Sequence, residues 1–155
     1  MCSSDLFPSH DKELGQDDIC IGVVVKVNIN GPQTALTNGG NIQCTISNVL
    51  GSQSSALNSS SITDVPNSNA WNLLREIYLN RVNSQEFICQ QNDIVQVVPA
   101  ISSPPDSANI LLGGTSSNSV MQYVGGYLIA KGLTPLEIST IRAAWMNLIK
   151  KIGRG

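Results

Sequence analysis

A long stretch of this chain carries almost no charge. Between Val27 and Leu74, a span of 48 residues, the only charged side chain is Asp64. Soluble domains usually carry charge on about a quarter of their residues, whereas only 13% of this chain is charged. Ser, Asn, Gln and Thr, with 19, 15, 9 and 7 residues, take its place. This composition is typical of β-structure and polar loops whose surface does not repel its neighbours, as in a subunit of a larger assembly.

Length and hydropathy set the broad class of the protein. With 155 residues, 41% of them hydrophobic, the chain can bury one real core and a small satellite. No apolar run reaches the roughly 18 residues of a membrane helix, so we expect no membrane contact. The first residues, Met1 to Asp5, are polar and acidic, unlike a secretion signal. We therefore expect a soluble protein that acts where it is made.

The cysteines and the single histidine do not form a metal-binding pattern. Cys2, Cys20, Cys44 and Cys89 lack C-x-x-C spacing, and His10 is the only histidine. We therefore expect no metal and no cofactor. The last three cysteines fall inside apolar strand patterns, which predicts buried free thiols. A Cys20–Cys44 disulfide is the alternative.

The first hundred residues divide into an arm and a strand-rich region. Residues 1–18 have no hydrophobic periodicity and predict an extended acidic arm. Residues 19–100 alternate or carry β-branched runs, with a Ser-rich loop at 51–61. The predicted strands are Ile19–Asn28, Gln33–Thr37, Asn41–Asn48, Glu86–Gln90 and Asp93–Val98.

One helix is predicted inside this strand-rich region, over residues 69–82. Ser68 or Asn69 would cap it, and Pro66 lies just outside. Its apolar stripe should cover the strands from one end or face. That stripe consists of Ala70, Trp71, Leu73, Leu74, Ile77 and Tyr78.

The chain should end in a linker and a helical pair. Residues 101–119 are rich in Ser, Pro and Gly and predict the linker, and residues 120–155 predict the pair. For Val120–Lys131 the following Gly132-Leu133 favours a helix, although Gly125-Gly126 would also suit the turn of a hairpin. The second helix has a clear start, with Thr134 as cap followed by Pro135 and Glu137.

The last helix carries a regular apolar seam. Spacings of three and four residues place the seam on one face, which we expect to pack on the rest of the chain or on another subunit. These candidate interface residues are Ile138, Ile141, Trp145, Leu148 and Ile152.

The order of the predicted elements resembles an OB-fold, a five-stranded barrel with a helix between its third and fourth strands. Ile21–Val27 resembles an OB first strand, and Asn92–Val98 is similar to the closing strand of small barrels. The predicted fold is therefore α+β: a small antiparallel, OB-like β-barrel with one packed helix, followed by a C-terminal helical hairpin.

A second resemblance concerns the C-terminus. Gly132-Leu133-Thr134, a short helix and the ending Ile152-Gly153-Arg154-Gly155 resemble the C-terminal endings of some tailed-phage virion structural proteins. Barrels of the OB type also occur as structural modules in phage tails and baseplates, although a fold alone does not fix a function. The resemblance implies a virion location and assembly in the host cytoplasm, with no catalytic or binding residues to transfer.

Neither catalysis nor nucleic-acid binding has a matching residue pattern. The only adjacent acids are Asp17 and Asp18, and His10 lies in the arm, so no acid–base pair is apparent. Residues 1–100 hold four basic and nine acidic side chains, and Phe87 is the one aromatic residue in the strands. Single-strand binding needs a basic groove with stacking aromatics, so nucleic acid is not an expected partner.

The sequence favours a non-enzymatic structural subunit, acting through contacts with its own copies and with other structural proteins. A tail, baseplate, neck or capsid-decorating position is expected. In the charge-poor span, Gln43, Thr45 and Ser54 are the candidate contact residues. The alternative is a small OB-type binding module for single-stranded nucleic acid or a partner peptide.

Overall fold

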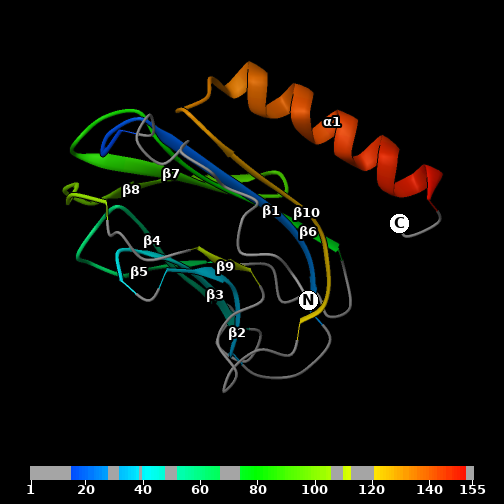
Figure 1. Ribbon diagram of the computed structural model, residues 1–155, viewed down its shortest axis with the longest axis horizontal. Helices are drawn as coiled ribbons and strands as arrows, with labels where there is room; N and C mark the ends of the chain where they lie inside the picture. Colours follow the sequence, from blue (N-terminus) through cyan, green and yellow to red (C-terminus); the bar gives the residue numbers. More distant parts are fainter. Residues whose placement is uncertain are drawn as a thin grey trace.

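The computed structural model describes residues 15–27, 32–38, 40–47, 52–66, 74–105, 110–112 and 121–152. These residues form two five-stranded antiparallel sheets and one helix, an α+β arrangement (Figure 1). Sheet I has the order β10 (Met121–Ala130), β1 (Ile19–Val27), β6 (Leu74–Arg81), β7 (Glu86–Gln91) and β8 (Ile94–Pro99). Sheet II has the order β5 (Thr63–Pro66), β4 (Ser52–Leu57), β3 (Ile42–Ser47), β2 (Pro32–Thr37) and β9 (Leu111–Leu112). The helix α1 spans Pro135–Lys151.

The elements stack in three layers. Sheet I lies between sheet II on one side and α1 on the other (Figure 1). The main core fills the space between the two sheets and takes apolar side chains from both of them. Its fully buried members include Ile21, Val23, Leu36, Ile46, Leu57, Ile77, Leu79 and Phe87.

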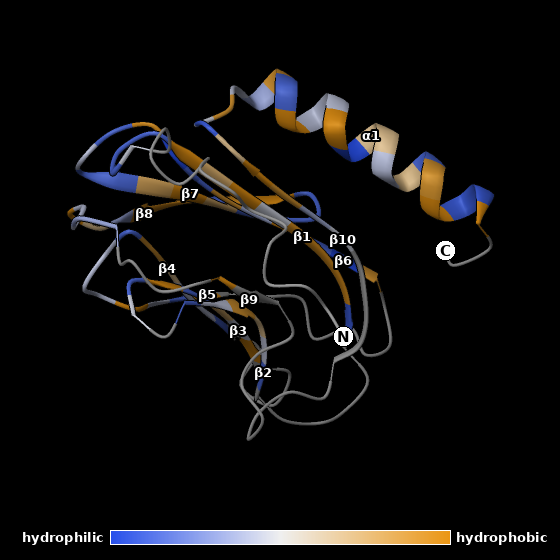
Figure 2. Cartoon of the chain, in the orientation of Figure 1, coloured by the Kyte–Doolittle hydropathy of each residue, from blue (hydrophilic) through white to orange (hydrophobic). Residues whose placement is uncertain are grey.

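The pattern of buried residues along the strands differs between sheet I and sheet II. In β3 the residues alternate, so that Ile42, Cys44 and Ile46 point into the core and Gln43 and Thr45 point outward. In β1 every residue from Ile19 to Val25 is buried, because both faces of sheet I are covered there. Figure 2 shows the corresponding apolar colouring along β1.

A second apolar cluster lies between sheet I and α1. Cys20, Tyr78 and Ile138 form its buried centre, and Trp145 packs against it. The ring of Tyr78 lies directly over Gly22, its cross-strand partner, so a Cβ at Gly22 would stand 2.9 Å from two ring carbons. The glycine therefore leaves room for the tyrosine ring that supports the helix.

Arg81 connects the two sheets at one end of the sandwich. Its side chain is fully buried and lies over the ring of Phe87, with its Cζ 5.6 Å from the ring centroid. It donates hydrogen bonds to the carbonyl oxygens of Leu57, Ala100, Asn83 and Glu86 at 2.9, 2.9, 3.2 and 3.3 Å. Burial lowers the pKa of Arg81, and the charge of Asp17 opposes this shift. Because Leu57 belongs to β4, its bond to Arg81 joins sheet I to sheet II.

The start of the C-terminal helix was predicted correctly. Thr134 Oγ1 accepts a hydrogen bond from the Glu137 N–H, and the Glu137 carboxylate accepts one from the Thr134 N–H, a complete capping box. Pro135 follows the cap, and Lys150 and Lys151 occupy the last turn, where positive charge suits the helix dipole.

The helix predicted over residues 69–82 is wrong where the structure describes it, because Leu74–Arg81 form the central strand β6. Leu74, Ile77 and Tyr78 match helical spacing in the sequence. In the strand, Leu74 and Tyr78 lie on the face toward α1, and Ile77 lies on the face toward sheet II. A strand buried on both faces carries apolar residues on both and so imitates a helical stripe. Trp71 and the proposed caps lie outside the described residues.

The predicted C-terminal helical pair is also wrong, because its first member is the strand β10. This strand runs antiparallel to β1 from Cys20 to Val27, and the backbone hydrogen bonds to β1 favour the extended form. Val24 pairs with Gly126 and Val25 with Val124, so the intervening glycine is an extra residue in the ladder rather than a hairpin turn. One helix, α1, remains in the described part of this region.

Two smaller corrections concern segments that were read as irregular. The Ser-rich stretch 51–61 contains β4, and the predicted linker 101–119 contains the short strand β9. Both segments lie beside strands of sheet II, which supply backbone hydrogen-bond partners. This pairing stabilises the extended form even where the residues have a low intrinsic strand propensity.

The remaining strand predictions are confirmed to within two residues for β1, β2, β3, β7 and β8. A closed OB-like barrel is not confirmed, because the described strands form two open sheets and β1 pairs with β10 and β6. Cys20, Cys44 and Cys89 are free and buried, as predicted, and the alternative Cys20–Cys44 disulfide is absent. Residues 1–14 of the predicted arm lie outside the described residues.

Candidate functional site

The three candidate contact residues of the charge-poor span lie together on the outer face of sheet II. Gln43 and Thr45 project from β3 and Ser54 from β4, with Thr45 directly opposite Ser54. All three are half-buried within the isolated chain. They share a face because alternate residues of β3 and β4 supply the core.

Two of these residues belong to a row across four strands, which we call the polar row: Thr34, Thr45, Ser54 and Asp64. The register places each member opposite the next. The Oγ1 atoms of Thr34 and Thr45 are 3.1 Å apart, and Gln43 Nε2 donates to Thr45 Oγ1 at 3.1 Å. Ser54 Oγ donates to Asp64 Oδ1 at 2.5 Å. The row therefore presents hydroxyl groups with one carboxylate at its end, and Gln43 adds an amide beside it.

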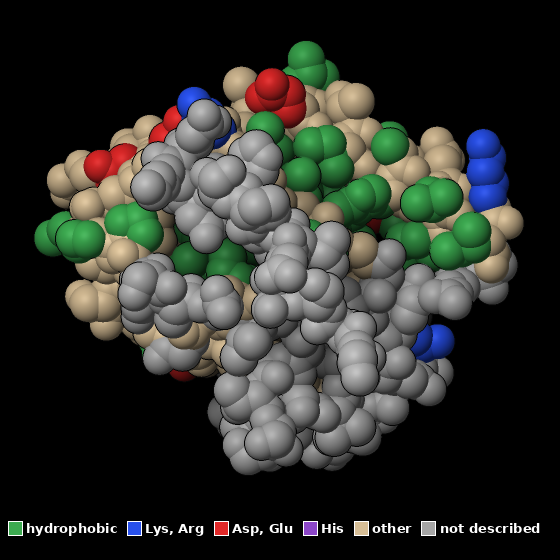
Figure 3. All heavy atoms as spheres, viewed as in Figure 1, with side chains coloured by type: hydrophobic (Ala, Val, Ile, Leu, Met, Phe, Trp, Pro, Cys, Tyr) green, Lys and Arg blue, Asp and Glu red, His purple; other side chains and the backbone are tan. Residues whose placement is uncertain are grey.

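The apolar seam of α1 divides between sheet I and solvent. Ile138 is buried, Ile141 and Trp145 pack on the cluster above β1 and β6, and the Trp145 ring stacks on Tyr78 with centroids 5.7 Å apart. In contrast, Leu148 and Ile152 are 55% and 51% exposed. Figure 3 shows hydrophobic side chains on the surface along α1. The seam thus holds the helix and leaves apolar surface uncovered.

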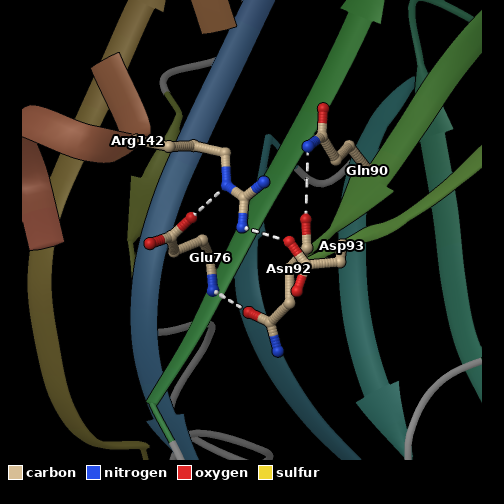
Figure 4. Close-up of polar contacts among 5 residues, drawn as sticks. All are labelled: Glu76, Gln90, Asn92, Asp93 and Arg142. Atoms are coloured by element: carbon tan, nitrogen blue, oxygen red, sulfur yellow. Dashed lines mark hydrogen bonds and ion pairs between the residues drawn. The ribbon is translucent and has the colours of Figure 1, made fainter. Parts of the chain in front are cut away.

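Arg142 fixes α1 to the sheet by charge (Figure 4). Its Nε donates to Glu76 Oε2 at 2.5 Å and its Nη2 donates to Asp93 Oδ1 at 3.0 Å. Burial alone lowers the pKa of Arg142 and is the largest single contribution. The hydrogen bonds and charges of Glu76 and Asp93 together outweigh it, so the pKa is raised. Asn92 also bonds to Glu76: its Oδ1 accepts a hydrogen bond from the Glu76 N–H at 3.0 Å. Since Glu76 is almost fully buried, its charge is neutralised within the chain.

The described cysteines are poorly suited to act as nucleophiles. Burial raises the pKa of Cys20 to about 12 and that of Cys89 to about 11, and it also raises the pKa of Cys44. Gln53 Nε2 donates to Cys89 Sγ at 3.1 Å within the core between the sheets. A thiol that stays protonated at neutral pH contributes packing rather than nucleophilic attack.

Sequence reasoning missed several residues that position these surfaces. Arg142 and Tyr78 were not recognised as supports of α1, and Ile149 is buried although it lies outside the predicted seam. The exposure of the strand β8, in which Val95 and Val97 are 57% and 55% exposed, was also missed. The strand itself was predicted, but which of its faces lacks a covering layer depends on where α1 ends.

Comparisons with known proteins leave the family open: no family model matches this chain, and no curated protein matches it significantly. Within the described residues, no helix is long and apolar enough to cross a membrane. No group of three or more metal-ligating side chains occurs there either. The surfaces that the fold presents are therefore the basis for a functional proposal.

Proposed function

We propose that this protein is a non-enzymatic structural subunit of a larger assembly, a component of a phage virion that acts through protein–protein contacts. The observation that carries the proposal is the polar row with its neighbour Gln43 on the outer face of sheet II. Its partners would be other copies of this chain and other structural proteins, and its location would be the virion.

The chemistry of this face suits permanent contact with another protein. Hydroxyl and amide groups can exchange their bonds with water or with each other for bonds to a partner. A buried ion would instead bring a desolvation penalty of several kcal/mol. Because the face has one carboxylate, Asp64, at its edge, its contacts should be nearly insensitive to salt.

The apolar surface of α1 supports the same proposal. Leu136, Leu148 and Ile152 are all more than half exposed, and Lys150 and Lys151 follow on the same helix. Interface cores are enriched in apolar side chains and depleted in charge. The C-terminal resemblance to phage virion proteins supplies the choice of assembly, which the fold alone does not specify.

Single lysine substitutions test the proposal. Gln43→Lys, Thr45→Lys and Ser54→Lys each place a charge on the outer face of sheet II, and Gln85→Lys places one on an exposed turn of sheet I as the matched control. Light scattering at low and high salt should show that the first three weaken association and the control does not. Association that is unchanged in all three variants would overturn the contact role of this face.

The virion location has a separate test. The protein should co-sediment with gradient-purified phage particles in a fixed ratio to the other structural proteins, as measured by quantitative mass spectrometry. The alternative, a binding module for single-stranded nucleic acid, predicts instead an affinity that falls steeply as salt increases. Absence from the particles together with salt-sensitive oligonucleotide binding would replace the proposal by that alternative.

A further inference from the structure

The four edges of the two sheets are not equally protected against pairing with another strand. In sheet II the edge strand β9 has two residues, and β5 has four, with Asp64 in the strand and Pro66 at its end. In sheet I the edge strand β10 contains two register irregularities against β1. Short length, charge, proline and bulges are the usual features that prevent edge-to-edge association.

The strand β8 has almost none of these features. It is six residues long, pairs with β7 in an unbroken register, and carries no charged side chain, with Pro99 only at its end. The Ala100 N–H donates to Gln85 O at 2.9 Å. In an antiparallel pair the backbone groups of alternate residues point to the same neighbour, so the N–H and C=O groups of Val98, Gln96 and Ile94 point toward β7. The N–H and C=O groups of Val95 and Val97 therefore point away from the sheet.

The side chains of the same two valines lie on the uncovered part of sheet I. Val98 on the opposite face belongs to the main core, so Val95 and Val97 face the layer of α1. The helix covers β10, β1 and β6 through Leu128, Cys20 and Tyr78 and does not extend over β8 (Figure 1). Outward backbone groups and exposed apolar side chains thus coincide on one strand.

We propose that β8 is a self-association edge, at which β8 of a second copy of this chain adds in antiparallel orientation about a two-fold axis. The symmetric placement of Val95 and Val97 about Gln96 suits a second copy of the same strand, and the charge next to the strand favours the antiparallel direction. Asp93 precedes β8 and no charged residue follows it as far as Pro105. An antiparallel pair places the two Asp93 side chains at opposite ends, whereas a parallel pair would place them side by side.

A register centred on Gln96 suits this pairing. It sets Val95 of one copy opposite Val97 of the other, and it uses both outward N–H groups of each copy. The valine side chains of the two copies then meet on the outer face, and the missing N–H of Pro99 falls outside the paired valines. The two copies of sheet I would become one continuous sheet. This inference rests on the proposed role as an assembling subunit and names one of its contacts.

Proline scanning of the edge is the test. Val97→Pro removes an outward N–H and leaves the bonds to β7 intact, whereas Val97→Thr keeps the N–H and the branched shape as the matched control. A second variant, Val95→Lys with Val97→Lys, blocks the edge by charge without changing the backbone. Sedimentation equilibrium of the full chain should show dimers for the parent and for Val97→Thr, and at least tenfold weaker association for both blocked variants.

Cross-linking tests the register. In the predicted pairing the two Gln96 residues are direct neighbours, so Gln96→Cys should form a covalent dimer when oxidised glutathione accepts the thiol electrons and is reduced to two glutathione thiols. Ser60→Cys, in the exposed connection between β4 and β5, should not form a covalent dimer.

Failure of this inference can be told apart from failure of the proposed function. Blocked β8 variants that associate like the parent, while the lysine variants of Gln43, Thr45 and Ser54 do not, would overturn the β8 edge and leave the structural role standing. A parent chain that stays monomeric at its highest soluble concentration would overturn self-pairing at β8, even if an added peptide strand bound there. Presence in purified particles would still decide the structural role.

Discussion

Sheets I and II are both antiparallel, but they differ in how many of their faces are covered by other parts of the chain. Sheet I is buried on both faces over β1 and β6, and its outer face carries the tyrosine, glycine and glutamate that hold α1. Sheet II is buried on one face, and its outer face carries the polar row. Substitutions beneath α1 on the outer face of sheet I should therefore reduce stability, whereas those on the outer face of sheet II should alter association.

The largest effect should come from the buried arginine that forms a hydrogen bond from sheet I to sheet II. Arg81→Ala leaves the buried carbonyls of Leu57 and Ala100 without their donor and opens a cavity beside Phe87. We expect the free energy of unfolding to fall by about 3–5 kcal/mol. Urea unfolding monitored by circular dichroism measures this loss.

Arg81→Lys is the matched control, because it keeps the charge but cannot span both carbonyls in one fork. Its loss should lie between those of the parent and Arg81→Ala. A loss below about 1 kcal/mol for Arg81→Ala would mean that the two sheets do not depend on this residue.

The next effect concerns the layer that covers sheet I. Trp145→Ala removes the ring that stacks on Tyr78, and because this tryptophan is only partly buried we expect a loss of about 2–3 kcal/mol, below the full range for a core tryptophan. Leu148→Ala, on the exposed part of the same seam, should change stability by less than about 0.5 kcal/mol. Equal losses in the two variants would contradict the division of the seam between sheet and solvent.

The sequence predicted the strands β1, β2, β3, β7 and β8 but not β4, β5, β6, β9 or β10. Alternation in β3 and β7 and the capping box of α1 are local signals, since each depends on residues close together in the chain. The strand β6 gave the wrong signal because α1, some sixty residues later, covers its second face. Arg75 and Arg81 also argued against a central strand, because an arginine is rarely buried unless it is paired. Such partners come from residues distant in the sequence and are not visible in the local pattern.

The surfaces were predictable to a different degree. Gln43, Thr45 and Ser54 were chosen for lack of charge, and the register of β3 and β4 brings them to one face. The pairing of Ser54 with Asp64 depends on β5, a strand that was not predicted from the sequence. The exposed edge of β8 depends on strand order, which a single chain's hydropathy pattern does not contain.

A smaller loss is expected where sheet I leaves room for the Tyr78 ring. Gly22→Ala would place a Cβ 2.9 Å from that ring, and we expect about 1–2 kcal/mol of destabilisation as the ring moves toward α1. Gly15→Ala is the control, because its Cβ would make an ordinary contact at 3.6 Å. In a thermal-unfolding double-mutant cycle, Tyr78→Leu should relieve most of the Gly22→Ala loss. Strictly additive losses would show that the ring is not what the methyl group meets.

The smallest change in stability should come from the outer face of sheet II. Thr45→Val keeps the branched shape that suits a strand but removes the hydroxyl bonded to Thr34 and Gln43. Because Thr45 and Gln43 are only half-buried, water can replace some of these bonds, and the free energy of unfolding should change by less than about 0.5 kcal/mol. Association should nevertheless weaken in sedimentation experiments, since the hydroxyl is a proposed contact group. A stability loss as large as that of Gly22→Ala would mean that the polar row serves the fold rather than a partner, and the contrast between the two sheets would disappear.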